Sequence, residues 1–346
     1  MKALILKEYK KFEYTDVAIP ELRNSRDVLV RIQAASICGS DVHGMDGSTG
    51  RRKPPIIMGH EASGFIEVCG AEVKDFKPGD RVTFDSTEYC GECFHCRRGE
   101  VNLCDKRLVL GVSCDEYRRD GTFADFVVIP DRILYRVPDE LDFVSAAMTE
   151  PLSVAVHAAN ITPLGVNDSV VVVGAGLIGL LLLQVLRASC SGTIIALDLD
   201  KGRLETAKRF GADFVLDAAD PASPASVREL TKGRGADRGF EAVGASAPIA
   251  LAIACLRKGA SLTLIGNASP KIELPLQAVV TRQLSILGSC AIAGEYEHSL
   301  DLMRRGKVDV RALVSAVAPL SEGASWFDRL YARESGLLKV VLEPGS

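Results

Sequence analysis

Residues 169–179 read SVVVVGAGLIG, and this stretch decides the fold of the second half of the chain. Four consecutive valines predict a strand buried on both faces, and the apolar residues 180–189 predict a helix directly after the glycine turn. In the GxGxxG pattern, Gly174 permits a tight turn, Gly176 lets a pyrophosphate approach the backbone, and Gly179 allows close helix–strand packing. The stretch therefore predicts a dinucleotide-binding domain.

An acidic residue follows the next predicted strand. That strand covers 193–197 and ends at Asp198, 19 residues past Gly179. A carboxylate in this position accepts hydrogen bonds from the adenosine ribose and repels a 2′-phosphate, so we predict NAD over NADP. Lys201 and Arg203 weaken this preference slightly, because a nearby arginine can accommodate the phosphate.

Strands and helices continue to alternate beyond Asp198. Further strands are predicted at 214–216, 238–243, 261–265 and 284–288, and helices at 203–210, 225–231 and 248–256. Six parallel strands with intervening helices form a doubly wound sheet. Gly244 and Gly266, at two strand exits, would let a cofactor approach the backbone at the carboxyl ends of the strands.

The remainder of the chain favours a β-rich domain. Alternating patterns predict strands at 1–6, 27–35, 62–68, 80–85 and 121–129, and residues 143–159 have helical spacing. A helix at 298–305 and a strand at 339–342 close the chain. We expect 1–152 and 290–346 to form this first domain, with 153–289 inserted as the nucleotide domain.

Length and composition agree with two soluble domains. The chain has 346 residues, 47% hydrophobic and 25% charged. A net charge of −4 argues against a nucleic-acid or anionic-membrane binder. The apolar run at 170–183 is 14 residues long, short of the ~20 that cross a bilayer. Residues 1–14 contain no secretion signal, which favours a cytoplasmic protein.

Residues 38–61, CGSDVHGMDGSTGRRKPPIIMGHE, combine metal-ligand and proton-transfer residue types. Cys38, His60 and Glu61 are ligands of the kind that zinc takes. Ser40 and His43 follow the cysteine by two and five residues, near enough to pass on a proton from a substrate hydroxyl. Taken singly, Cys38 could be a small core residue and His60 a structural histidine.

A second cysteine group follows: two residues separate Cys90 from Cys93 and Cys93 from Cys96, and seven residues separate Cys96 from Cys104. Four thiolates complete a tetrahedron around zinc, so this site should be structural. A zinc ribbon for nucleic acid is the rival interpretation, but few basic residues flank the group. We expect the scattered cysteines to be buried thiols: Cys69, Cys114, Cys190, Cys255 and Cys290.

These motifs together resemble the zinc-dependent medium-chain dehydrogenases, nearest to the sorbitol (L-iditol) and galactitol-phosphate dehydrogenases. The resemblance rests on residues 38–43, 59–61, 150–152, 174–179 and 339–341, on the four clustered cysteines and on Asp198. It implies an α/β fold, in which a β-rich GroES-like catalytic domain carries an inserted Rossmann domain with a doubly wound parallel sheet. It also implies NAD and two zinc ions per chain as cofactors.

The resemblance also implies site residues. Catalytic zinc would be held by Cys38 and His60, with Glu61 and Glu150 as ligands or near ligands. The less favoured interpretation of Glu150 is a solvated acid in a first helical turn. Expected NAD contacts are Gly174, Gly176, Leu177, Ile178, Gly179, Asp198, Arg203, Val243, Ile265, Gly266, Asn267, Cys290, Ala291 and Ile292. The implied reaction is hydride transfer from a secondary alcohol of a polyol or its phosphate to NAD, giving a ketose.

Several alternatives stay open. Sorbitol dehydrogenases often have an Arg-Tyr pair where this chain has Ala291 and Ile292. An L-threonine dehydrogenase, which tends to have Asp in place of Glu150, and a non-catalytic nucleotide-binding relative are the rival functions. Arg51, Arg52 and Lys53 form either a solvated basic turn or a site for an anionic substrate group. An open sheet edge at 284–288 predicts a dimer, and the resemblance implies a tetramer as the alternative.

Overall fold

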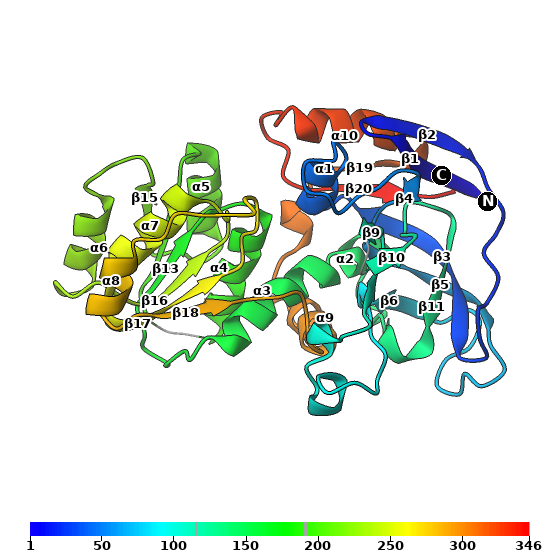
Figure 1. Cartoon of the computed structure of the whole chain (residues 1–346), viewed down its shortest axis with the longest axis horizontal. Helices are drawn as coiled ribbons and strands as arrows, with labels where there is room; N and C mark the ends of the chain where they lie inside the picture. Colours follow the sequence, from blue (N-terminus) through cyan, green and yellow to red (C-terminus); the bar gives the residue numbers. More distant parts are fainter. Residues whose placement is uncertain (115–116, 190–191, 346) are drawn as a thin grey trace. The chain divides into compact units, whose positions relative to one another are not determined.

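The computed structural model describes residues 1–114, 117–189 and 192–345. The chain divides into two compact units, Met1–Ser153 with Ile292–Ser346, and Val154–Ala291 (Figure 1). These bounds lie beside the expected domains 1–152 with 290–346, and 153–289. The assignment of the units as functional domains stays a prediction.

The unit formed by Val154–Ala291 contains a parallel sheet. Six described strands have the order β15 (Phe214–Asp217), β14 (Ile194–Asp198), β13 (Val170–Val173), β16 (Ala236–Glu241), β17 (Leu256–Leu264), β18 (Ser285–Gly288). All neighbours pair in parallel. The helices are α4 (Leu177–Ser189), α5 (Lys201–Arg209), α6 (Ser223–Leu230), α7 (Ser246–Cys255) and α8 (Leu276–Thr281). The predicted doubly wound sheet is confirmed, and its order is that of dinucleotide-binding folds.

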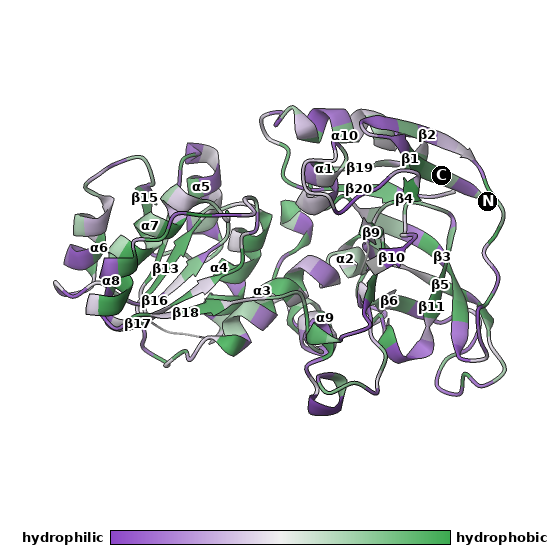
Figure 2. Cartoon of the chain, in the orientation of Figure 1, coloured by the Kyte–Doolittle hydropathy of each residue, from purple (hydrophilic) through white to green (hydrophobic). Residues whose placement is uncertain are grey.

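The glycine turn between β13 and α4 has the expected geometry. The four valines of β13 are at most 1% exposed, and Figure 2 shows β13 and α4 as hydrophobic. Gly174 has a φ of +99°, which side chains rarely adopt. A Cβ at Gly179 would collide with the carbonyl oxygen of Gly174, so the helix starts close to the strand only because residue 179 is glycine.

The other unit is β-rich. Its main sheet has seven described strands: β12 (Leu134–Arg136), β6 (Arg81–Phe84), β5 (Glu61–Cys69), β3 (Asp27–Ser36), β20 (Val340–Glu343), β19 (Ala316–Pro319), and β11 (Phe126–Pro130), which pairs with β3. A smaller sheet has the order β2 (Lys11–Asp16), β1 (Lys2–Glu8), β4 (Ile56–Ile57), and two short pairs join β7 (Thr87–Glu88) to β8 (Leu108–Val109) and β9 (Val112–Cys114) to β10 (Tyr117–Arg119). The final strand β20 therefore lies beside β3, from the start of the chain.

Short helices connect these sheets. They are α1 (Gly39–Gly44), α2 (Phe143–Ala147), α9 (Tyr296–Arg304) and α10 (Gly323–Tyr331), while α3 (Thr149–Ile161) leads into the parallel-sheet unit. The helical pattern at 143–159 is divided at Met148, the C-cap of α2. A common core packs the strands together, with Leu6, Ile32, Phe84, Phe123 and Phe327 among its fully buried members.

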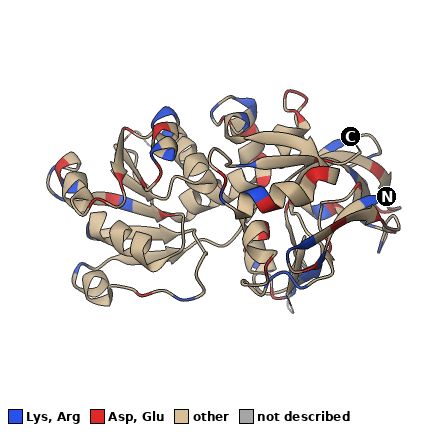
Figure 3. Cartoon of the chain, turned by 90° about the horizontal axis from the view of Figure 1, so that it is seen from above, with Lys and Arg blue, Asp and Glu red and all other residues tan. Residues whose placement is uncertain are grey.

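Charged residues are distributed over the chain, and the scattered cysteines differ in burial. Lysines and arginines mingle with acidic residues along the chain (Figure 3). No helix of the described residues is both long and apolar enough to span a membrane. Cys255 is buried as expected, but Cys69, Cys114 and Cys290 are only half-buried, so the expectation was wrong for these three. Cys190 lies outside the described residues.

Candidate active site

Three strands of the main sheet bring the expected ligands together. Ser36, at the end of β3, is paired with Glu61 at the start of β5, and with Val341 of β20. Cys38 therefore follows one strand where His60 precedes its neighbour. One ligand atom from each of Cys38, His60 and Glu61 lies within 4.8 Å of the others. Sequence analysis expected this trio, and strand pairing explains how residues about twenty positions apart meet.

Glu61 is held by a buried ion pair that sequence analysis missed. Its Oε2 lies 2.5 Å from Nζ of Lys339, and both side chains are 1% exposed. Ser36 Oγ also donates to this oxygen, and Lys339 Nζ donates to the carbonyl of Ile37 at 3.0 Å. Burial pulls the pKa of Lys339 down, but the surrounding acidic groups together, Glu61 foremost among them, outweigh it and the pKa is raised. The ammonium therefore stays charged and fixes the Glu61 carboxylate.

A second buried acid faces His60. Its Nδ1 lies 3.5 Å from Oδ2 of Asp41, whose side chain is fully buried in α1. A carboxylate facing one ring nitrogen of a histidine leaves the other for a metal and fixes the ring. Arg52 in turn pairs with the other oxygen of Asp41, Oδ1, through Nη2 at 2.8 Å and Nε at 3.2 Å.

Glu150 lies in the first turn of α3 and is 7% exposed, so it is not the solvated acid of the alternative interpretation. Burial raises its pKa to about 7, against the effect of His60, and the charge of Glu61 adds to the rise. Ser86 Oγ donates to its Oε1 at 3.3 Å. Among the described residues, the group of ligand atoms within 4.8 Å does not include Glu150. Its role as ligand or near ligand stays a prediction.

The four clustered cysteines converge as expected. One sulfur from each of Cys90, Cys93, Cys96 and Cys104 lies within 4.8 Å of the others. Zn–S bonds of ~2.3 Å place tetrahedral sulfurs about 3.8 Å apart, and Cys90 Sγ and Cys96 Sγ are 4.0 Å apart. The donor set therefore fits zinc with no position left for substrate. His95 is engaged elsewhere, since its Nδ1 lies 2.9 Å from Glu100 Oε2.

Ser40 and His43 extend from the metal cluster along α1. Ser40 Oγ donates to Cys38 Sγ at 3.3 Å, so it lies beside a candidate ligand. His43 is exposed in the last turn of the helix. Both positions suit the passage of a proton from the cluster toward solvent, and these roles stay predictions.

The basic run at 51–53 does not act as one surface. Arg52 is 2% exposed and paired with Asp41, so the expectation that it meets a substrate anion is wrong, because its charge is neutralised inside the fold. Arg51 and Lys53 are exposed. Ser113 fixes the backbone of this run, donating from its backbone N–H to Arg51 O at 3.3 Å and accepting from Lys53 N at 2.5 Å.

In the parallel-sheet unit, Asp198 supports the glycine turn. It is 9% exposed, and its two oxygens accept backbone N–H groups from Ala175 at 2.6 Å and Asp200 at 2.9 Å. Each carboxylate oxygen has a second lone pair, so a ribose hydroxyl could still donate to it. Of the other expected NAD contacts, Val243 is 41% exposed and Ile292 is fully buried, and their contacts with NAD stay predictions.

Glu241 is a further residue of this unit that sequence analysis missed. It ends β16, is fully buried, and accepts the backbone N–H groups of Val243 at 2.8 Å and Gly244 at 2.9 Å. It therefore holds the strand-exit loop where the cofactor was expected to approach. An acid two residues before a valine-glycine pair at a predicted strand end was the available signal.

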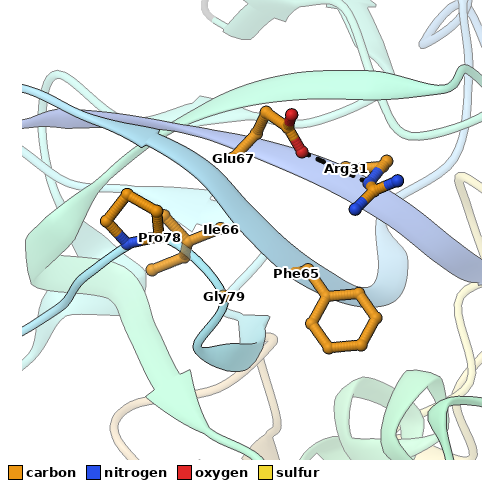
Figure 4. Close-up of a pocket in the computed structure, with 6 residues that line it drawn as sticks. All are labelled: Arg31, Phe65, Ile66, Glu67, Pro78 and Gly79. Carbon is orange, nitrogen blue, oxygen red and sulfur yellow. Dashed lines mark ion pairs between the residues drawn. The ribbon is translucent and has the colours of Figure 1, made fainter.

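A surface hollow of about 330 Å³ lies over β3 and β5 in the β-rich unit (Figure 4). Arg31 and Glu67 form an ion pair of 3.3 Å along its lining, and both are about half exposed. Phe65, Ile66, Pro78 and Gly79 complete its lining. None of these residues belongs to either metal-ligand cluster, so the hollow is separate from the candidate active site.

Asp85 predicts a pH dependence of stability. Burial raises its pKa to about 7, against the N–H that Thr87 donates, and the charge of Glu295 adds to the rise. An unfolded aspartate binds its proton only below pH ~4, so between ~4 and 7 the folded state holds more protons and the free energy of unfolding falls as pH rises. Asp85→Asn should remove this fall and be more stable than wild type at pH 8, by up to ~4 kcal/mol.

Chemical denaturation at several pH values measures this effect. Asp139→Asn, at a fully exposed side chain, is the control and should keep the wild-type pH profile. An Asp85→Asn protein whose stability follows the wild-type profile would contradict the assignment.

A β-rich unit with one open and one closed metal-ligand cluster, joined to a dinucleotide-type sheet, defines a metal-dependent dehydrogenase. The model described as alcohol dehydrogenase GroES-like domain matches residues 24–139, and the model described as zinc-binding dehydrogenase matches 178–305. The chain belongs to this family of zinc-binding dehydrogenases, which confirms the resemblance found from its motifs.

Two relatives match nearly end to end. D-xylulose reductase A of Aspergillus oryzae is 36% identical over 341 residues, covering 95% of this chain and 93% of that protein. Sorbitol dehydrogenase of Bacillus subtilis is 31% identical over 349 residues, covering 99% and 97%.

Solved structures agree in fold. Galactitol-1-phosphate dehydrogenase of Escherichia coli superposes with a TM-score of 0.90 at 27% identity, covering 99% of this chain and all of that one. A Sinorhizobium meliloti zinc-binding dehydrogenase bound to NADP has a TM-score of 0.89 at 28% identity, and an Escherichia coli alcohol dehydrogenase complexed with NADH has 0.91 at 28%, each covering 99% of both chains. The family therefore pairs zinc with a nicotinamide cofactor.

Proposed function

We propose that the protein oxidises a secondary alcohol of a polyol, or of a polyol phosphate, to a ketose with NAD. The observation that carries this proposal is the cluster of Cys38, His60 and Glu61, whose carboxylate Lys339 fixes. Relatives named as xylulose reductase, sorbitol dehydrogenase and galactitol-1-phosphate dehydrogenase support the substrate class. Glu150 favours polyols over threonine, whose dehydrogenases tend to have Asp at this position.

The chain's own residues have separate roles in this reaction. A zinc ion held by Cys38 and His60, with Glu61 or Glu150, would supply Lewis-acid polarisation of the substrate hydroxyl, and bound NAD would accept hydride. Ser40 Oγ takes the hydroxyl proton, and His43 at the exposed end of α1 passes it to solvent. Asp41 keeps the His60 ring in place.

The NAD preference rests on Asp198. Asp198→Ala should lower the ratio of kcat/KM for NAD to that for NADP by ~10-fold or more, because a charge-assisted hydrogen bond to the ribose is worth ~1.5–3 kcal/mol and the repulsion of a 2′-phosphate is lost. Steady-state kinetics with both cofactors measure the ratio.

Asp200 offers the matched control. It caps α5 by accepting the N–H of Arg203 at 3.0 Å, so Asp200→Ala should weaken the helix and leave the cofactor ratio unchanged. A wild-type enzyme with the higher kcat/KM for NADP would overturn the preference.

Arg51 is the remaining arginine of the basic run for an anionic substrate group, since it is exposed where Arg52 is buried. If it grips a phosphate, Arg51→Ala should lower kcat/KM for a polyol phosphate ~10-fold while sparing the neutral polyol. Steady-state kinetics on a polyol and its phosphate measure this difference. Arg97→Ala, in the four-cysteine segment at residues 90–104, is the control. Equal losses of kcat/KM on both substrates would show that Arg51 is a solvated surface residue and does not bind the phosphate.

A homo-oligomer, dimer or tetramer, is also proposed. Strand β18 is an edge of the parallel sheet, and α8 nearby in sequence exposes Leu276 at 63% and Val280 at 67%. A twofold copy could pair with this edge and cover these side chains. Light scattering that shows a monomer at micromolar concentration would contradict the proposal. A cytoplasmic location suits thiols grouped as metal ligands in a reducing compartment.

A further inference from the structure

Arg52 is a buried cation in a run of exposed neighbours. It is 2% exposed, while Arg51 and Lys53 on either side are exposed. Burying a guanidinium is costly unless its charge and donors are satisfied. The chain accepts this burial beside the metal-ligand cluster, and the relevant question is which groups the guanidinium contacts there.

The backbone is shaped to admit this side chain. A Cβ at Gly44, the last residue of α1, would lie 2.5 Å from Cγ of Arg52. The aliphatic part of the arginine side chain therefore packs against α1 at a residue that has no side chain. Arg52 Nη1 donates to the carbonyl of Arg51 at 3.3 Å, and Ser113 fixes the same turn. The absence of a side chain at Gly44 and the hydrogen bonds to the Arg51 carbonyl therefore fix the Arg52 side chain in this orientation.

Besides the Arg51 carbonyl, the guanidinium contacts two side chains, those of Asp41 and Ser40, and each of them lies beside a candidate metal ligand. Nε and Nη2 both donate to Oδ1 of Asp41, which leaves Oδ2 facing His60 Nδ1 at 3.5 Å. Nη2 also donates to Ser40 Oγ at 3.3 Å, and that hydroxyl donates to Cys38 Sγ at 3.3 Å. One side chain thus links the surroundings of the histidine and cysteine ligands.

We propose that Arg52 is a positioning residue of the metal site, which holds Asp41 against His60 and Ser40 against Cys38. Pairing with Oδ1 turns the Asp41 carboxylate so that Oδ2 meets the imidazole, and this fixes the ring for its ligand nitrogen. Partners of this kind, which orient a ligand, typically change metal affinity 10–100-fold when removed. The inference rests on the metal site of the proposed function, but it does not depend on the substrate.

Cobalt binding tests the proposal without measuring turnover. The protein is loaded with Co²⁺ at both sites, and the visible d–d bands and the chelator-competed affinity are recorded for wild type, Arg52→Gln and Arg52→Lys. Arg52→Gln should bind cobalt at the Cys38 site ~10-fold or more weakly with shifted bands. The lysine keeps the charge but lacks the planar fork, so Arg52→Lys should lie between the two.

Two controls separate positioning from stability. The four-cysteine site in the same molecule should keep its cobalt spectrum in every variant. Arg238→Gln removes another largely buried arginine, paired with Asp168 at 2.9 Å in the other unit, and should leave both cobalt sites unchanged even if it destabilises the fold.

A double-mutant cycle tests the path through Asp41. If Arg52 acts through this carboxylate, Arg52→Gln should weaken cobalt binding less in an Asp41→Asn background than in wild type. Additive losses would overturn the proposal. So would a folded Arg52→Gln protein with wild-type spectrum and affinity or, where that variant does not fold, an Arg52→Lys protein with both unchanged. Because cobalt is the probe, failure of the polyol assignment would show separately, as lack of turnover with intact metal spectra.

Discussion

Lys339→Met is expected to lower the free energy of unfolding by ~3–5 kcal/mol, which would be among the largest effects of any single substitution in this chain. The substitution keeps the length of the apolar stem and removes only the ammonium. It leaves the Glu61 carboxylate, itself 1% exposed, without the cation 2.5 Å away. Removing one partner of a buried ion pair exposes the full desolvation cost of the other.

The same substitution should weaken metal binding at the Cys38 site. Lys339 and Ser36 hold one oxygen of Glu61, and Lys339 also ties the sheet to the carbonyl of Ile37, one residue before Cys38. Without the ammonium, the buried Glu61 carboxylate loses both its fixed orientation and the charge that balances it. Bound zinc per chain, measured by mass spectrometry after dialysis, should fall in Lys339→Met.

Denaturant unfolding measures the change in the free energy of unfolding, and two further variants test whether the buried ion pair causes it. Lys339→Met/Glu61→Gln removes both charges and should recover much of the loss, since replacing both partners of a buried pair is far less costly than replacing one. Lys106→Met breaks the exposed pair with Glu92 and should change stability little, because solvent screens that pair. A Lys339→Met protein as stable as Lys106→Met would contradict the account of the buried pair.

The parts of the fold that depend on local pattern were predictable from the sequence. The glycine turn at 174–179 is specified by neighbouring residues. The strands and helices around the parallel sheet were predicted from the spacing of apolar residues along the sequence. The four-cysteine cluster is specified by spacing over 15 residues, 90–104. Strands β2 and β4 were missed, because one is largely exposed and the other has two residues.

Parts that depend on distant packing were not predictable. The strand at 339–342 was expected, but Lys339 meets Glu61 across 278 positions, and only the pairing of β20, β3 and β5 brings them together. Arg52 was grouped with its charged neighbours because a sequence does not show that Gly44 opens a path to Asp41. Lys339 and Arg52 are both buried cations beside the candidate active site, and from the sequence alone each would be expected on the surface.

The cysteine lobe, residues 90–104, has little regular secondary structure. Between Cys90 and Cys104 the structure has only the short 3-10 helices Cys96–Arg98 and Val101–Leu103, and Phe94 is 67% exposed. A segment without an apolar core cannot offset its ordering entropy by burial. Structural zinc contributes ~10–16 kcal/mol of binding free energy in small isolated domains, which is ample to order such a lobe.

On the expectation of one zinc ion at each ligand cluster, Cys93→Ser should reduce zinc from two ions per chain to one and unfold the lobe locally. Its thiol has a pKa lowered to about 6, chiefly because the Cys96 N–H donates to it, so it is ready to bind a cation as thiolate. Metal analysis and hydrogen exchange over 90–104 measure the two effects. The control is Cys69→Ser, a half-buried cysteine outside both clusters, which should retain two zinc ions and a protected lobe. A Cys93→Ser protein that still holds two zinc ions would show that three sulfurs suffice, and that closure by four is not what orders this lobe.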